Sequence, residues 1–302
     1  MGLRLTGGMM VAFAAFLIFP AGCADRASSG PGVGHGDPTP PAARSTDLPA
    51  GVVPAGYQGQ VRGTITVLES PDHGPQLCAM VAQSYPPQCG GPDIDGWSWD
   101  DVHAESANGT IWGHYTVTGR FADGLFTMTE PAQPPQPPPA EDLAASPCPV
   151  PAGGWVPPDP DTATAAARGE AMRVARQSDG YGGVWIGWLI PERQITEYTA
   201  DDPSLYVLNF ATTGDAAALE RELRRVWGGN LCVAPTEHTE AELNRIANEL
   251  MELPGVLSAS ADTVEGTARA TVWVATEEIW RQAVQTSGED VIELDGILKP
   301  ID

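Results

Sequence analysis

Residues 231–298 decide the fold of the second half of the chain: LCVAPTEHTEAELNRIANELMELPGVLSASADTVEGTARATVWVATEEIWRQAVQTSGEDVIELDGIL. Thr239-Glu-Ala-Glu242 matches a capping box, which opens a helix, and Pro254-Gly255 ends that helix. Glu265-Gly266 is a turn between two alternating apolar runs, which is typical of a hairpin. The stretch predicts, in order, a strand, a helix, two strands, a helix and a strand, at 231–234, 239–253, 256–263, 268–275, 277–286 and 291–298.

This β-α-β-β-α-β order is that of the split arrangement of a ferredoxin-like sandwich. Upstream, a helix is expected at 161–177, beginning after Pro160 with Asp161 as its cap, and another at 216–227. Two β-rich runs lie between these helices, at 184–190 and 205–211. We therefore expect residues 161–302 to form an α+β domain with ferredoxin-like topology, a fold that does not by itself specify an activity.

Residues 57–130 indicate a small all-β domain. Strands are expected at 60–67, 77–81, 111–119 and 125–129. Asp123-Gly124 supplies the positive φ angles that a hairpin turn needs. Several short strands in so few residues predict a small barrel or sandwich. Between them, residues 86–101 contain many turn-forming residues, so no regular structure is expected there.

Two segments of biased composition flank the β domain, one before it at 24–56 and one after it at 131–160. Residues 24–56 are rich in Pro, Gly, Ser and Ala and carry few large apolar groups, so a disordered tether is expected. Prolines cluster in residues 131–160, which favours a stiff, extended spacer there. The resulting plan has five parts: a signal peptide at 1–22, a tether at 23–56, a β domain at 57–130, a linker at 131–160 and an α+β domain at 161–302.

The N-terminus has the features of an export signal. A basic start containing Arg4 precedes an apolar run of 11 residues, Met9 to Phe19. That run is shorter than the roughly 20 residues needed to span a bilayer, and it suits a signal-peptide core. Pro20-Ala21-Gly22-Cys23 resembles the lipobox of bacterial lipoproteins, although this family usually has an aliphatic residue where Pro20 stands. The resemblance implies that Cys23 becomes the lipidated N-terminus; the alternative is an ordinary secretory signal with an incidental cysteine.

The cysteine count agrees with export and anchoring. With Cys23 assigned to lipid, four of the five cysteines remain, and they can form two disulfides in an oxidising compartment. Three pairings are possible, of which we favour Cys78–Cys89 and Cys148–Cys232. The first closes a short loop in the β domain, and the second ties the linker to a strand of the α+β domain.

The charge of the chain excludes one class of partner. It has 39 acidic and 16 basic residues, for a formal net charge of -23. Such a surface repels phosphate backbones, so no nucleic-acid partner is expected. The expected partners are the membrane, through the lipid anchor, and a protein or cell-wall polymer of the envelope.

A candidate ligand surface lies in the turn-rich segment after Cys89. Trp97 and Trp99 are expected to cap a small core; the alternative is that, in an extended segment, they point to the same side and form a stacking platform for a sugar or peptide. Asp93 and Asp95 are expected to lie in a solvated acidic turn; the alternative is that their carboxylate oxygens bind calcium. The spacing after Asp93 does not fit an EF-hand, because glycine comes fourth rather than sixth.

Three further motifs, for a catalytic serine, a zinc site and a nucleotide-binding loop, do not match the patterns that these sites require. Gly96-Trp-Ser-Trp-Asp100 lacks the final glycine of a nucleophile elbow. His73, His103 and His114 lack the spacing of zinc ligands, and the glycine-rich stretches do not follow a strand. We therefore expect no catalytic residue, no cofactor and no metal ligand. The leading hypothesis is a non-catalytic envelope lipoprotein that binds a partner; the alternative is an extracytoplasmic hydrolase whose active-site residues are distant in sequence.

Overall fold

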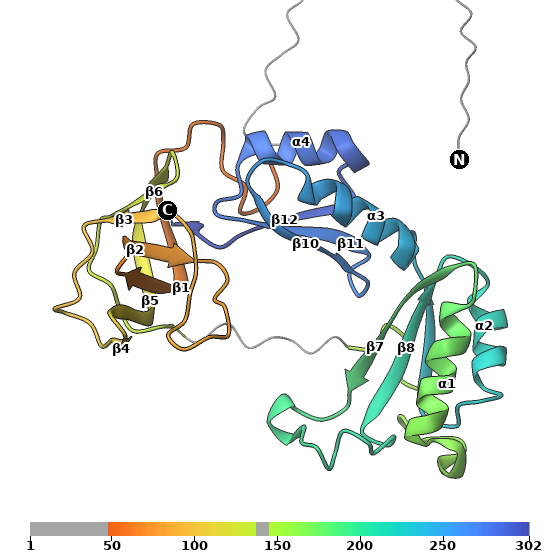
Figure 1. Ribbon diagram of the computed structural model, residues 1–302. Helices are drawn as coiled ribbons and strands as arrows, with labels where there is room; N and C mark the ends of the chain where they lie inside the picture. The colour runs from red at the N-terminus through yellow and green to blue at the C-terminus, as the bar shows by residue number, and fades with distance from the viewer. Residues whose placement is uncertain (1–47, 137–144, 302) are drawn as a thin grey trace, which may run out of the picture. The chain divides into compact units, whose positions relative to one another are not determined.

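The computed structural model describes residues 48–136 and 145–301 (Figure 1). The predictions for the signal peptide, for Cys23, for the tether up to residue 47 and for linker residues 137–144 lie outside the described residues. The strands are β1 Gln60–Ser70, β2 His73–Cys78, β3 Asp93–Asp95, β4 Glu105–Ala107, β5 Thr110–Ala122, β6 Leu125–Met128, β7 Tyr181–Trp188, β8 Tyr206–Thr212, β9 Leu231–Pro235, β10 Val256–Asp262, β11 Thr267–Val272, β12 Ile292–Gly296 and β13 Lys299–Ile301. The helices are α1 Ala165–Arg176, α2 Ala216–Leu223, α3 Glu240–Met251 and α4 Glu277–Ser287.

The first sheet is built on a ring of paired strands. The pairings run β1–β2–β3–β6–β5, and β5 pairs with β1 again, so the circuit closes. β1 and β5 form its longest ladder, from Val61 opposite Gly119 to Glu69 opposite Ile111. Alternate residues of β1, among them Ile65 and Val67, are buried in the core of the ring. β4 and β13 extend this sheet beyond the ring.

Two predictions for this region have different outcomes. The turn at Asp123-Gly124 is confirmed, because both residues have positive φ angles, 51° and 75°, and β5 and β6 pair on either side of it. The prediction that residues 86–101 hold no regular structure is wrong, because β3 lies within them. β3 has one buried residue, Ile94, between two exposed aspartates, and a strand this short leaves little periodic signal.

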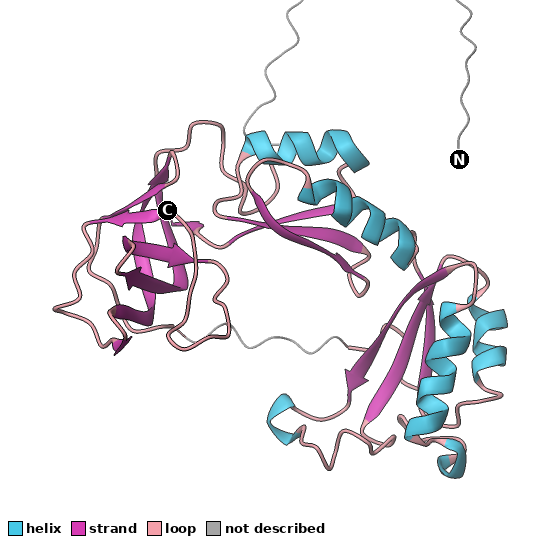
Figure 2. Ribbon diagram, viewed as in Figure 1, coloured by secondary structure: helices cyan, strands magenta, loops and turns pink. Residues whose placement is uncertain are grey.

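The second half of the chain folds as two modules of the same topology. α1-β7-β8-α2-β9 is followed by α3-β10-β11-α4-β12. In each module the first two strands are antiparallel and the third is parallel to the second. The helices of each module cover one face of its three-stranded sheet (Figure 2).

This duplication corrects the ferredoxin-like prediction. That topology requires the strand at 231–234 to share a sheet with the three strands that follow it. β9 instead pairs with β8, and β10–β12 form a separate sheet. The order of elements was predicted correctly from β9 to β12, but β13 was missed and the first strand was assigned to the wrong sheet.

The segments flanking the domains are attached to them. Val53 was predicted to lie in a disordered tether, but it is buried and pairs with Thr276 at the start of α4. Leu48 and Val52 pack against the core of the second module. At the far end, β13 pairs with β1, and the adjacent Leu298 is buried in the core of the ring. The tether prediction is therefore wrong for residues 48–56.

Both favoured cysteine pairings are present. The Cα atoms of Cys78 and Cys89 are 5.7 Å apart, and those of Cys148 and Cys232 are 5.8 Å apart, each pair joined by a disulfide. Disulfides of this kind persist in oxidising, extracytoplasmic compartments. Across residues 48–136 and 145–301, no helix is both long enough and apolar enough to cross a membrane.

Candidate binding groove

The two tryptophans of the predicted ligand surface lie in an aromatic cluster with Tyr115. The ring centroids of Trp97 and Trp99 are 5.1 Å apart, and those of Trp97 and Tyr115 are 5.2 Å apart. The indole Nε1 of Trp99 donates a hydrogen bond to a Glu69 carboxylate oxygen at 2.6 Å. Both tryptophans are partly buried and pack against the core of the ring. In this arrangement they cover one part of the ring core.

The two aspartates of the same prediction lie on β3. Asp93 and Asp95 are exposed, on either side of the buried Ile94. The side-chain amide of Gln76 donates a hydrogen bond to Asp93 Oδ1 at 2.8 Å. The structure thus places the tryptophans against the core and leaves the aspartates exposed, rather than gathering the four into one recess.

A different aromatic pair lines a recess in the surface. Phe121 on β5 and Trp273, directly after β11, have ring centroids 6.2 Å apart with 34° between their planes. On one side of the pair is a hollow of about 570 Å³. Its other lining residues are Ala79, Met80, Gly90, Gly91, Pro92, Gly124 and Leu257. The Met80 side chain is 72% exposed there.

A second hollow, of about 400 Å³, also has Phe121 and Trp273 among its lining residues. Its apolar walls include Tyr57 and Ile279, and its polar groups include Gln58, Asp123 and Glu278. Because the two hollows share the aromatic pair, we name them together the Trp273 groove. The groove combines two aromatic rings with carboxylate and amide groups that can accept and donate hydrogen bonds.

The fold sets both aromatic rings in place. Trp273 lies in the bend that follows β11 and packs against the core of the ring, to which the neighbouring Val274 also belongs. The carbonyl of Trp273 accepts a hydrogen bond from the Leu298 amide at 2.8 Å, which joins this segment to the chain leading into β13. Phe121 pairs with Phe126 across the β5–β6 hairpin.

The sequence analysis did not single out Trp273. Nothing in the sequence indicated that Phe121, about 150 residues earlier, would lie beside it.

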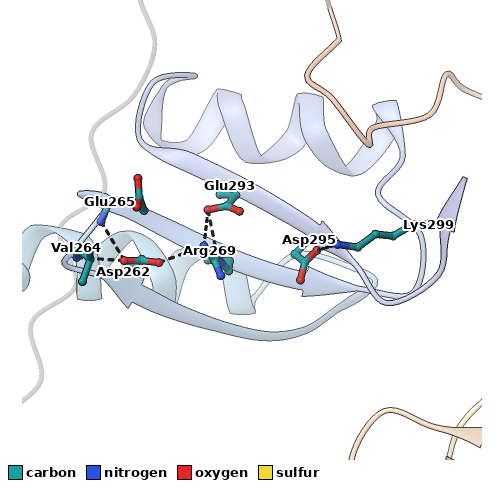
Figure 3. A network of polar contacts seen from close by, with 7 residues as sticks. All are labelled: Asp262, Val264, Glu265, Arg269, Glu293, Asp295 and Lys299. Carbon is teal, nitrogen blue, oxygen red and sulfur yellow. Dashed lines mark hydrogen bonds and ion pairs between the residues drawn. The ribbon is translucent and has the colours of Figure 1, made fainter. Parts of the chain in front are cut away.

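The uncovered face of the second module's sheet carries a polar network instead (Figure 3). Arg269 pairs with Glu293 at 3.0 Å and with Asp262 at 3.2 Å, and Lys299 pairs with Asp295 at 3.2 Å. Asp262 also accepts two backbone hydrogen bonds within the β10–β11 turn. These carboxylates already have partners, so we assign the network a structural role on the sheet surface.

No group of three or more potential metal-ligating side chains occurs within the part of the chain that the structure describes. Comparison of the sequence with protein-family models gives no match, and comparison with curated proteins gives none either.

Proposed function

We propose that this protein is a lipid-anchored component of the bacterial cell envelope that binds a cell-wall polysaccharide in the Trp273 groove without altering it chemically. The observation that carries the proposal is the groove itself. Phe121 and Trp273 line two adjoining hollows, beside polar groups of Gln58, Asp123 and Glu278.

The chemistry of the groove suits a sugar chain. Aromatic side chains bury a large apolar area with specific geometry, and the neighbouring carboxylate and amide groups can bond to hydroxyl groups. We propose further that the closed circuit of strands is a small barrel, an architecture that binds oligosaccharides in some proteins. The net charge of -23 disfavours a polyanionic polymer, so the ligand is a neutral or amine-bearing polysaccharide.

The anchor is the second part of the proposal. The lipobox-like Pro20-Ala21-Gly22-Cys23 supports lipidation of Cys23, and the two disulfides agree with an extracytoplasmic location. Replacement of the lipid-bearing residue by Cys23→Ala is expected to move the protein from the membrane fraction to the soluble extracytoplasmic fraction. A Cys23→Ala protein that stays in the membrane fraction would rule out lipid anchoring through this residue.

Binding is tested by co-sedimentation of the purified protein with insoluble cell-wall polysaccharide over a range of polymer concentrations. Trp273→Ala removes the shared aromatic wall, and we expect it to weaken binding at least tenfold. Tyr198→Ala is the matched control, because Tyr198 is 94% exposed and lies outside the lining of the groove. Circular dichroism verifies that both variants are folded. Equal binding by a folded Trp273→Ala variant and the parent protein would contradict the proposal.

The alternative of a hydrolase is favoured by one observation: the carboxylates of Asp123 and Glu278 line the same hollow. Paired carboxylates are the groups that glycoside hydrolysis uses. Release of soluble reducing sugar during the same incubation, abolished by Asp123→Asn or Glu278→Gln, would establish hydrolysis. Binding with no sugar released supports the non-catalytic function.

A further inference from the structure

A separate recess lies in the first module, between α1 and the edge strand β7. Its volume is about 330 Å³, within the range of small-molecule sites. Val184, Ile186 and Trp188 contribute to it from alternate positions of β7 and are only partly buried. The remaining lining residues are Arg168, Met172, Trp185, Ala200 and Leu208. The recess is therefore apolar apart from one cationic side chain.

That cation, Arg168, is held in a fixed position. Its Nη1 donates hydrogen bonds to the Tyr206 hydroxyl at 3.2 Å and to the Ala200 carbonyl at 3.3 Å. Its guanidinium carbon lies 5.8 Å from the centroid of the Tyr206 ring, and the Trp188 ring packs against the same tyrosine at 5.6 Å. The Arg168 side chain is only 23% exposed, so its charge is partly withdrawn from water.

The carboxylate that neutralises this charge is replaceable. Arg168 Nη2 pairs with Asp201 at 3.1 Å, but the Asp201 side chain is 69% exposed. Because the Asp201 carboxylate is already mostly in water, it can leave Arg168 with little change in its own solvation. A guanidinium has five N–H donors, more than the three hydrogen bonds that Arg168 makes here, so it can also serve an incoming anion.

We propose that this recess binds a small ligand with an apolar chain and a terminal carboxylate, such as a medium-chain fatty acid. The chain lies along Val184, Ile186 and Trp188, and the carboxylate pairs with Arg168 in place of Asp201. The positive charge of Arg168 attracts the ligand's carboxylate to this recess. The rest of the chain is strongly acidic and would repel an anion. This site shares no lining residue with the Trp273 groove.

The test is calorimetric titration of the full chain carrying Cys23→Ser, in detergent-free buffer, with decanoate kept below its micelle concentration. Decanol and decylamine, which have the same chain length, test the requirement for an anion. We expect decanoate to bind at least tenfold more tightly than decanol, and decylamine to bind more weakly than either. Equal affinities for decanoate and decanol would overturn the proposal.

Two substitutions locate the binding. Arg168→Met keeps an apolar side chain without the charge, and we expect it to weaken decanoate binding at least tenfold while leaving decanol binding unchanged. Asp201→Asn removes the competing carboxylate and is expected to tighten decanoate binding severalfold. Because Asp201 is exposed, this variant keeps the test decisive if Arg168→Met fails to fold. Unchanged decanoate affinity in Asp201→Asn would contradict the exchange of carboxylates.

Trp273→Ala should leave decanoate binding unaltered, which separates this proposal from the polysaccharide one.

Discussion

Two neighbouring glycines beside the Trp273 groove differ in the space around them. A Cβ atom built on Gly91 would lie 1.9 Å from the Leu77 carbonyl oxygen, whereas one built on Gly90 would meet nothing within 4 Å. Neither residue has a positive φ angle, so the difference between them is one of packing alone. Only a residue without a side chain allows this close approach of the chain to β2.

Gly91→Ala is therefore expected to destabilise the fold by about 1–3 kcal/mol, the usual cost of overpacking. Gly90→Ala, the matched control, should change stability by less than about 0.5 kcal/mol, as exposed substitutions do. Chemical denaturation of the two variants measures both values. Equal stabilities of the two variants would show that the Gly91 backbone is not closely packed against Leu77.

At the scale of single residues, the sequence predicted the disulfide pairing but not the contact between distant aromatic residues. The four disulfide cysteines were paired correctly because their number and order limited the choices. Trp97 and Trp99 were recognised as neighbours, and they do contact each other. The groove was missed because Phe121 and Trp273 are brought together by tertiary packing, which leaves no local signal in the sequence.

Among the elements, α3 has the most completely defined start. The Thr239 hydroxyl accepts a hydrogen bond from the Glu242 amide at 3.2 Å, and Glu242 accepts one from the Thr239 amide at 2.8 Å. The latter bond lowers the pKa of the Glu242 carboxyl. A lowered pKa means that this contribution to stability is present near neutral pH and is lost as the pH falls through the lowered value.

Thr239→Ala is expected to cost about 1 kcal/mol of unfolding free energy, because it leaves an N-terminal amide of α3 without its partner. Thr286→Ala is a suitable control, since Thr286 is exposed in the last turn of α4 and caps no helix start. Thermal or chemical denaturation compares the two. A Thr239→Ala variant as stable as the control would mean that the capping box contributes nothing.

The elements also show why some boundaries were not predictable. Asp161 was expected to cap the first helix, but it lies in the 3₁₀ turn Pro160–Thr162, and the helix begins four residues later. The actual cap is Thr164, whose hydroxyl accepts a hydrogen bond from the Ala167 amide. Both residues are good caps, and Pro160 suits the first turn of either helix type, so local sequence does not choose between them.

In the whole molecule, the two disulfides close loops of very different length. Cys148 and Cys232 are 84 residues apart in sequence, and Cys78 and Cys89 are 11 apart. On the chain-entropy model, the longer loop contributes about 4.5 kcal/mol and the shorter about 3 kcal/mol. We therefore expect the double variant Cys148→Ser/Cys232→Ser to lose more unfolding free energy than Cys78→Ser/Cys89→Ser. Equal losses, measured by denaturation, would contradict that ranking.

The arrangement of sheets was the least predictable feature at this scale. The pattern from Leu231 to Gly296 predicts the kind and order of the elements, but it does not specify with which strands β9 pairs. β9 pairs with β8 as the third strand of the first module, which becomes clear only when the two modules are compared. Likewise, β13 adds an edge strand to a sheet that begins more than 200 residues earlier, a pairing for which the sequence carries no periodic signal.

The central claim is that this chain is an exported, lipid-anchored and disulfide-bonded binding protein. The most direct test is intact mass spectrometry of the protein extracted from its own membrane with mild detergent. We expect the mass of residues 23–302 plus lipid, less the four hydrogens lost in forming two disulfides. An unlipidated mass, or a mass that still includes residues 1–22, would contradict the claim.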